Sequence, residues 1–127
     1  MLDTNVIVSA HLNPNGLERA VLNWALDQGF FVSGPILQEY GDVLRRAKFK
    51  IGSKLAAESI RLIGSRATLV TPLHSVTEAR DPDDNHFLEC AEAAGADYLV
   101  TGNKKHFPSS YKNTRVVDAR EFLDLIV

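Results

Sequence analysis

Hydrophobic positions along the chain follow two alternating patterns. Apolar residues recur at helical spacing over residues 17–28, 36–47, 53–63, 87–94 and 118–126. Short runs rich in β-branched and aromatic residues, at 30–32, 68–71, 98–101 and 115–117, stand between them. This alternation predicts βαβ units around a parallel sheet.

Local signals support these boundaries. Ser33 and Pro35 are typical of a helix cap and an early helical position, and Ser53 is placed to cap the next helix. Asp118, with Glu121 three residues later, predicts a capping box at the start of the last helix. Together the elements predict an α/β fold, a three-layer α/β/α sandwich with a central parallel sheet.

Length and composition limit the possible classes. With 127 residues and 45% hydrophobic content, we expect one domain over residues 1–127. The formal charge of −2 lacks a global basic excess, so a nucleic acid would have to meet a local patch. A lone cysteine, Cys90, forms no internal disulfide, and no stretch is apolar enough for a membrane span. We therefore expect a cytoplasmic protein with no membrane association.

Polar side chains gather where the predicted strands end. They occupy residues 3–5, 81–85 and 101–103, and Glu39 lies at the edge of the apolar stripe of its helix. Open parallel sheets bind ligands beyond the carboxyl ends of their strands, where loops from several βα units meet. Residues that are distant in sequence can thus share one site.

Carboxylates in such a site repel one another unless a hard cation neutralises them, and Mg²⁺ or Mn²⁺ is the expected occupant. A divalent ion can bind a phosphodiester oxygen and lower the pKa of a bound water, so a few acids suffice for phosphodiester hydrolysis. The simpler interpretation is that the acids at 81–84 are a solvated loop that caps a helix.

Other residues with possible chemistry have simpler interpretations. Glu39 alone would more often be an exposed helix residue, Cys90 a core thiol, and Trp24 a core or interface residue. The four histidines lack zinc-site spacing. Of these, His86 and His106 flank the proposed site and could touch a substrate, but surface positions are the expectation.

Four motifs in order resemble those of PIN-domain proteins, and more narrowly the bacterial group described as toxins of toxin-antitoxin systems. They are Leu2–Val6, Leu37–Tyr40, Asp81–Asn85 and Tyr98–Asn103. The resemblance spans nearly the whole chain. It implies a Mg²⁺- or Mn²⁺-dependent endonuclease that cleaves single-stranded RNA and leaves a 5′-phosphate and a 3′-hydroxyl. It also suggests a small antitoxin protein as partner, and we expect a homodimer.

The resemblance assigns roles residue by residue. Asp3, Glu39 and Asp84 match the family's acids and become the catalytic residues and metal ligands. Asn5 matches the polar residue that supports the first acid. The expected supporting residues are Asn5, Asp81, Thr101 and Asn103.

The chain departs from the family pattern in two places. Many relatives have a fourth acid where this chain has Asn103, which brings an amide carbonyl but no charge. Only Met1 and Leu2 precede Asp3, so either the central strand is a stub or the chain as given is shortened. In addition, residues 6–8 favour a strand by propensity, whereas the family begins a helix near Asn5; we follow the family.

Basic side chains predict the substrate path. The expected substrate-binding residues are Lys104 and Lys105, close to the proposed site, together with Arg45 and Arg46. The rest of the two basic clusters consists of Lys48, Lys50, Lys54 and Lys112.

Two other classes of α/β protein do not fit the residues present, and one alternative remains. A haloacid-dehalogenase phosphatase needs a second acid where this chain has Asn5. A phospho-receiver domain needs an acceptor where it has Thr71 and Pro72. The strongest alternative is a catalytically weak PIN-like module that binds RNA or a protein partner.

Overall fold

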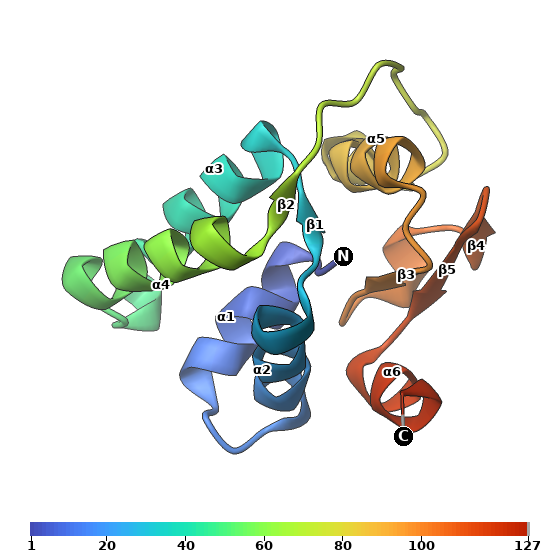
Figure 1. The fold of residues 1–127 in the computed structure, drawn as a ribbon. Coiled ribbons are helices and arrows are strands. Elements are labelled where there is room, and N and C mark those ends of the chain that lie inside the picture. The colour runs from blue at the N-terminus through green and yellow to red at the C-terminus, as the bar shows by residue number, and fades with distance from the viewer. Residues whose placement is uncertain (127) are drawn as a thin grey trace.

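A computed structural model describes residues 1–126, and in it short strands lie among longer helices, as expected for an α/β fold (Figure 1). None of the helices in this range has the length and apolar character needed to cross a membrane. The α-helices are α1 (Thr4–Leu12), α2 (Leu17–Gln28), α3 (Gly34–Leu44), α4 (Ser53–Arg66), α5 (Asn85–Ala94) and α6 (Ala119–Leu125), and the 3₁₀ turns are η1 (Ala47–Phe49), η2 (Pro82–Asp84) and η3 (Lys104–His106). The strands are β1 (Phe31–Val32), β2 (Thr68–Leu69), β3 (Tyr98–Val100), β4 (Ser110–Tyr111) and β5 (Thr114–Val117).

The strands form two small sheets. β1 and β2 pair in parallel, while β5 lies between β3, which is parallel to it, and the antiparallel β4. The N-terminus lies in the middle of the molecule between the two sheets (Figure 1). Leu2 makes an isolated parallel bridge to Val100, which does not join the sheets into one. The expected three-layer sandwich with one continuous central sheet is therefore not confirmed.

Helix α1 forms in spite of the β-branched run at its centre. Val6, Ile7 and Val8 are all buried, and so is Ala10, because α2 and α3 pack against this helix. Packing against these neighbours stabilises the helix, so burial outweighs the strand propensity of this segment. The expectation of a helix near Asn5 is confirmed.

Helix α3 carries Glu39 to the site. The Ser33 hydroxyl accepts a hydrogen bond from the backbone N–H of Ile36 at 3.3 Å, as the sequence predicted for this cap. Ile36, Tyr40 and Leu44 are fully buried on one face, which leaves Glu39 half-buried at its edge. The apolar stripe expected to run to residue 47 ends as α-helix at Leu44 and continues into η1.

The expected cap of α4 is wrong by one position. Gly52 is the N-cap residue with a φ of 90°, and Ser53 is the first residue of the helix. A positive φ is readily adopted by glycine, so the chain turns at Gly52 rather than being capped by the serine hydroxyl.

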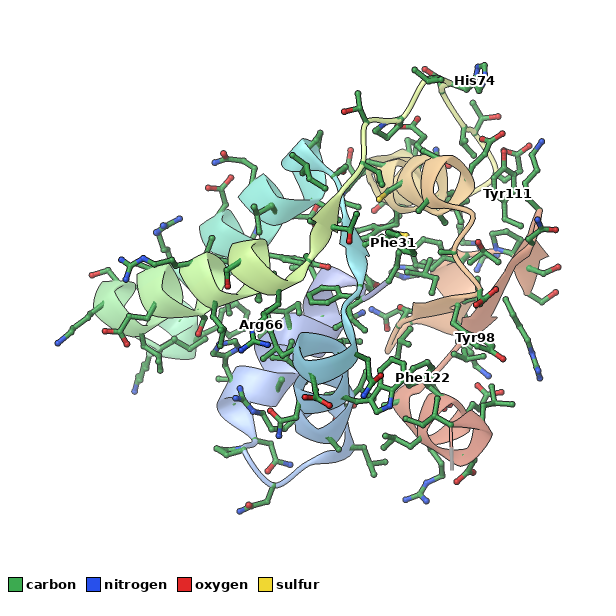
Figure 2. All side chains as sticks on the ribbon, in the orientation of Figure 1. Phe31, Arg66, His74, Tyr98, Tyr111 and Phe122 are labelled. Atoms are coloured by element: carbon green, nitrogen blue, oxygen red, sulfur yellow. The ribbon has the colours of Figure 1, made fainter. Side chains whose placement is uncertain are left out.

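Helix α6 closes the far side of the core. Asp118 and Glu121 form the predicted capping box. The Phe122 ring packs edge-on against Tyr98 (Figure 2), with 5.7 Å between ring centroids, and against Trp24, with 5.1 Å. Trp24 makes this contact with a side chain that is 38% exposed, so the expectation of a core position is wrong.

The fully buried Tyr40 ties α3 to the N-terminal segment, because its hydroxyl donates a hydrogen bond to the Leu2 carbonyl. Tyr40→Phe should lower the free energy of unfolding by about 1–2 kcal/mol, since the buried carbonyl would lose its partner. Urea denaturation measures the change. Tyr111→Phe, which removes a 3.3 Å bond from a half-buried hydroxyl to Glu92, is the control and should change much less; equal losses would contradict the role of Tyr40.

Candidate active site

One cleft of about 640 Å³ collects the acids predicted to act together. Asp3, Glu39 and Asp84 all line it, although they come from the start of α1, from α3 and from the start of α5. The residues of α1 that line the cleft lie on one face of the helix, because Asn5, Val8, Ser9 and Leu12 are three or four residues apart. The full lining is Asp3, Thr4, Asn5, Val8, Ser9, Leu12, Glu39, Val43, Arg46, Phe49, Asp81, Asp84, Asn103 and His106.

Asp3 is the most deeply buried of these acids. Its side chain accepts a hydrogen bond from the Thr101 hydroxyl at 2.7 Å, and the residue is only 7% exposed. Burial raises the pKa of Asp3 to about 6, against the effect of Thr101 and with added repulsion from Asp84 and Glu39. Asp3 therefore takes up a proton readily when no cation is near.

Glu39 is held by two neighbours. The Thr4 hydroxyl donates a hydrogen bond to one carboxylate oxygen, and Nε2 of His86 lies 3.2 Å from the other. Burial raises the pKa of Glu39, but these two neighbours outweigh it, so the pKa is lowered. His86 shows the matching effect: burial disfavours its charge, but Glu39 raises its pKa overall. Glu39 is thus kept ionised.

Asp84 stands at the N-cap position of α5, at the end of the η2 turn. The side chain of Asp81 caps this turn by accepting a hydrogen bond from Asp83 N–H at 3.0 Å, which positions Asp84. Burial and repulsion from Asp81 raise the pKa of Asp84, although His106, with Nδ1 3.5 Å away, opposes the change. The capping interpretation of the 81–84 acids therefore holds for Asp81, whereas Asp84 makes no side-chain cap bond.

The supporting residues join the two ends of the chain. The Asn5 amide oxygen accepts a hydrogen bond from Gly102 N–H at 3.0 Å, and the Thr101 hydroxyl accepts one from Asn103 N–H at 3.0 Å. Thr101 thus connects Asp3 with the loop that carries Asn103. Asn103 lines the cleft beside the acids.

The donor chemistry of the cleft fits a hard divalent cation. All three acids offer carboxylate oxygens, and repulsion from neighbouring acids contributes to the raised pKa of both Asp3 and Asp84, which is the effect such an ion would remove. Within residues 1–126, however, no three Asp, Glu, His or Cys side chains are close enough to hold one ion as they stand. The hydrogen bond from Thr4 and the ion-pair contact with His86 keep Glu39 engaged in this conformation.

The expected basic residues differ in where they point. Arg46 lines the cleft, but the guanidinium of Arg45 folds back over Gly41. Lys104 is paired with Glu121 at 2.6 Å. Lys105 lines a second hollow that shares Asn103 and His106 with the acid-lined cleft.

Lys112 does not line either hollow. It pairs with Glu92 at 3.5 Å and lies over the Tyr111 ring. It lies in the turn between β4 and β5.

Thr4 and His86, both beside the acids, escaped the sequence reasoning or were given a different place. Thr4 was not singled out, although it directly follows Asp3. His86, expected at the surface, is half-buried against Glu39, while His106 stays largely exposed beside Asp84. The position of His86, two residues after Asp84 on the first turn of α5, was the available signal.

The order of these acids along an α/β chain and their meeting in one cleft are features of a nuclease class. Residues 1–105 match the PIN domain family, so the chain belongs to that family, whose members are generally metal-dependent nucleases. An uncharacterized protein of Methanocaldococcus jannaschii is 28% identical over 109 residues, which cover 82% of this chain and 70% of that protein. No solved structure gives a significant match.

The raised pKa of Asp3 makes stability depend on pH in the metal-free protein. The folded chain retains a proton on Asp3 up to about pH 6, whereas the unfolded chain loses it near pH 4, so stability should fall as pH rises through this window. Asp3→Asn should remove the loss and be more stable than the parent at pH 7 by about 2 kcal/mol, with little gain at pH 4.

Urea denaturation in EDTA at both pH values measures this difference. Asp124→Asn, at an exposed position of α6, is the control. If Asp3→Asn kept the full pH dependence of the parent, burial of this carboxylate would not be its source.

Proposed function

We propose that the chain is a Mg²⁺- or Mn²⁺-dependent endoribonuclease that cleaves single-stranded RNA. The observation that supports it is the meeting of Asp3, Glu39 and Asp84 in one cleft from three separate elements. Burying carboxylates together in this way costs stability, because burial, with repulsion from neighbouring acids added, raises the pKa of Asp3 and of Asp84. Membership of the PIN domain family supports a catalytic role for these acids.

We assign a role in this reaction to each residue of the acid-lined cleft from its position. Asp3 and Asp84 are the proposed principal metal ligands, and Glu39 is a further ligand or a holder of water. When bound, the ion would neutralise phosphate charge and make a water molecule more acidic. Thr101 orients Asp3, while Thr4 and His86 keep Glu39 ionised and fixed in direction.

Basic groups on either side of the acids would hold the RNA backbone. Arg46 lines the acid-lined cleft, and Lys105 lines the hollow that adjoins it. Lys104 is a weaker candidate than the sequence suggested, because Glu121 neutralises it. The proposed products carry a 5′-phosphate and a 3′-hydroxyl.

The proposal extends to a role as the toxin of a toxin-antitoxin pair, in the cytoplasm, with a small antitoxin protein as partner and a homodimer as the assembly. The motif resemblance supports this extension. An antitoxin-like gene next to this one, together with growth arrest on expression that the neighbour relieves, would support the toxin role. If neither the neighbouring gene nor the growth arrest is found, the toxin role is contradicted, whereas the proposed ribonuclease activity is not.

A second candidate is a PIN-like module that binds RNA or protein with weak catalysis. It is favoured by Asn103 in place of a fourth acid and by the engagement of Glu39 with Thr4 and His86. Mn²⁺ titration of the purified chain separates the two: saturable binding at the acids supports the nuclease, and no binding supports the module.

Asp3→Asn and Asp84→Asn should each abolish Mn²⁺-dependent cleavage of single-stranded RNA while the fold is retained, because each removes a proposed principal ligand. Cleavage of a labelled oligoribonucleotide on a gel, with circular dichroism for folding, measures both effects. Asp124→Asn is the matched control for loss of one negative charge. Undiminished cleavage in either cleft variant would contradict the proposed role of that residue as a metal ligand.

Asn103→Asp should tighten Mn²⁺ binding about three- to tenfold, because a hard cation gains more from a carboxylate than from an amide carbonyl. Added repulsion with Asp3 and Asp84 in the empty site limits the gain. Isothermal titration calorimetry of the parent and the variant decides, with Asn23→Asp as control outside this cleft. Equal affinities would show that residue 103 does not face the ion.

A further inference from the structure

The acid-lined cleft changes character along its length. On α1 it begins at Asp3 and Asn5 and continues through Val8 to Leu12, which is 51% exposed. At a rise of 1.5 Å per residue, Asp3 and Leu12 stand about 13 Å apart along the helix axis. One end of the cleft is therefore acidic and the other is apolar.

The opposite wall repeats this change. Glu39 and Val43 lie one turn apart on α3, Arg46 follows after the helix ends, and Phe49 of η1 completes the lining. The end of the cleft away from the acids is therefore apolar on both sides. Val8 and Leu12 line it on α1, and Val43 and Phe49 line it on the other side, with Arg46 in the same lining. We use the name apolar wall for these four residues.

Phe49 differs from an ordinary core residue. It packs partly against the core, yet its side chain lines the cleft and stays partly exposed. The ammonium of Lys48 lies 5.1 Å from the centre of its ring. The ring is thus an aromatic surface with a cation next to it, which suits a base attached to a phosphate.

We propose that Phe49 and the apolar wall bind a nucleobase of the RNA by stacking, while Arg46 in the same cleft pairs with a backbone phosphate of that strand. The inference rests on the proposed function and adds where the substrate's base lies. Because a base must leave its helical stack to reach an aromatic ring inside a cleft, this site accepts single strands and rejects duplexes. An apolar wall has few groups that read base edges, so its preference among the bases is weak.

A nucleotide fits this cleft better than an apolar protein segment does. An uncharged apolar protein segment laid along the apolar wall would leave Arg46 and Lys48 without a negative partner. A nucleotide brings an apolar base for the wall and a phosphate for these two cations on one covalent frame. The presence of Lys48 beside Phe49 adds a second contact for the backbone.

The test measures RNA binding without cleavage, in an Asp84→Asn background. Fluorescence anisotropy compares a labelled hexauridylate with an abasic oligonucleotide of the same length and charge. Phe49→Leu should weaken hexauridylate binding about tenfold, the loss of one stacked base, and leave abasic binding unchanged. Phe49→Trp should bind hexauridylate like the parent, and its added fluorescence should be quenched on binding.

The matched control is Tyr111→Leu. Tyr111 also has a lysine over its ring, Lys112 at 5.8 Å, but it lies on β4, well away from α3 and α4 (Figure 2). This variant should bind both oligonucleotides like the parent. An equal loss for hexauridylate and the abasic strand in Phe49→Leu, or an unquenched Phe49→Trp that binds RNA, would overturn the inference.

Two further results keep this inference apart from the proposed function. If Phe49→Leu binds RNA like the parent but shifts the molar mass in solution, the apolar wall is a contact between copies and the inference fails. Cleavage of RNA by the unmodified chain with Mn²⁺ tests the function by itself. Stacking at Phe49 without any cleavage would support the base site and overturn the nuclease.

Discussion

The hydrogen bonds between residues 1–5 and residues 98–102 are the contact on which the rest of the site depends. Backbone bonds pair Met1 with Tyr98 and Val100, and Asp3 N–H with the Val100 carbonyl at 2.9 Å. The side-chain bonds from Thr101 to Asp3 and from Gly102 to Asn5 continue this ladder beyond the strand. Because the partners of these side-chain bonds are 97 and 98 residues apart in a chain of 127, Asp3 reaches the cleft only when the fold is complete.

The same arrangement sets an electrostatic constraint. Burial disfavours the charge of Asp3 and of Asp84, and neighbouring acids add to the effect. Both residues stand at the N-cap of a helix, α1 and α5, where the helix dipole favours negative charge. This contribution does not cancel the cost, since both pKa values remain raised. The site therefore holds charge that the folded chain alone does not neutralise.

The cleft combines an acidic end and an apolar end because its two long sides, α1 and α3, each carry both kinds of residue. On α1 the cleft lining changes from Asp3 and Asn5 to Val8 and Leu12, and on α3 it changes from Glu39 to Val43. Helix periodicity keeps such residues on one face, so a short sequence pattern produces a continuous surface. The acidic end and the aromatic end are then separated by rigid elements, a separation that loops would not maintain as well.

The sequence by itself determined the elements and the acids. Periodicity predicted most helices and strands, and the ordered motifs predicted the family and the residues Asp3, Glu39 and Asp84, because local spacing and motif order are properties of the chain. Only the tertiary structure decided that two small sheets stand in place of one, and that Arg46 enters the cleft whereas Lys104 turns to Glu121. It also decided that the β-branched residues of α1 are buried and that His86 lies against Glu39. These outcomes depend on which distant side chains meet when the core packs, and no local pattern encodes that choice.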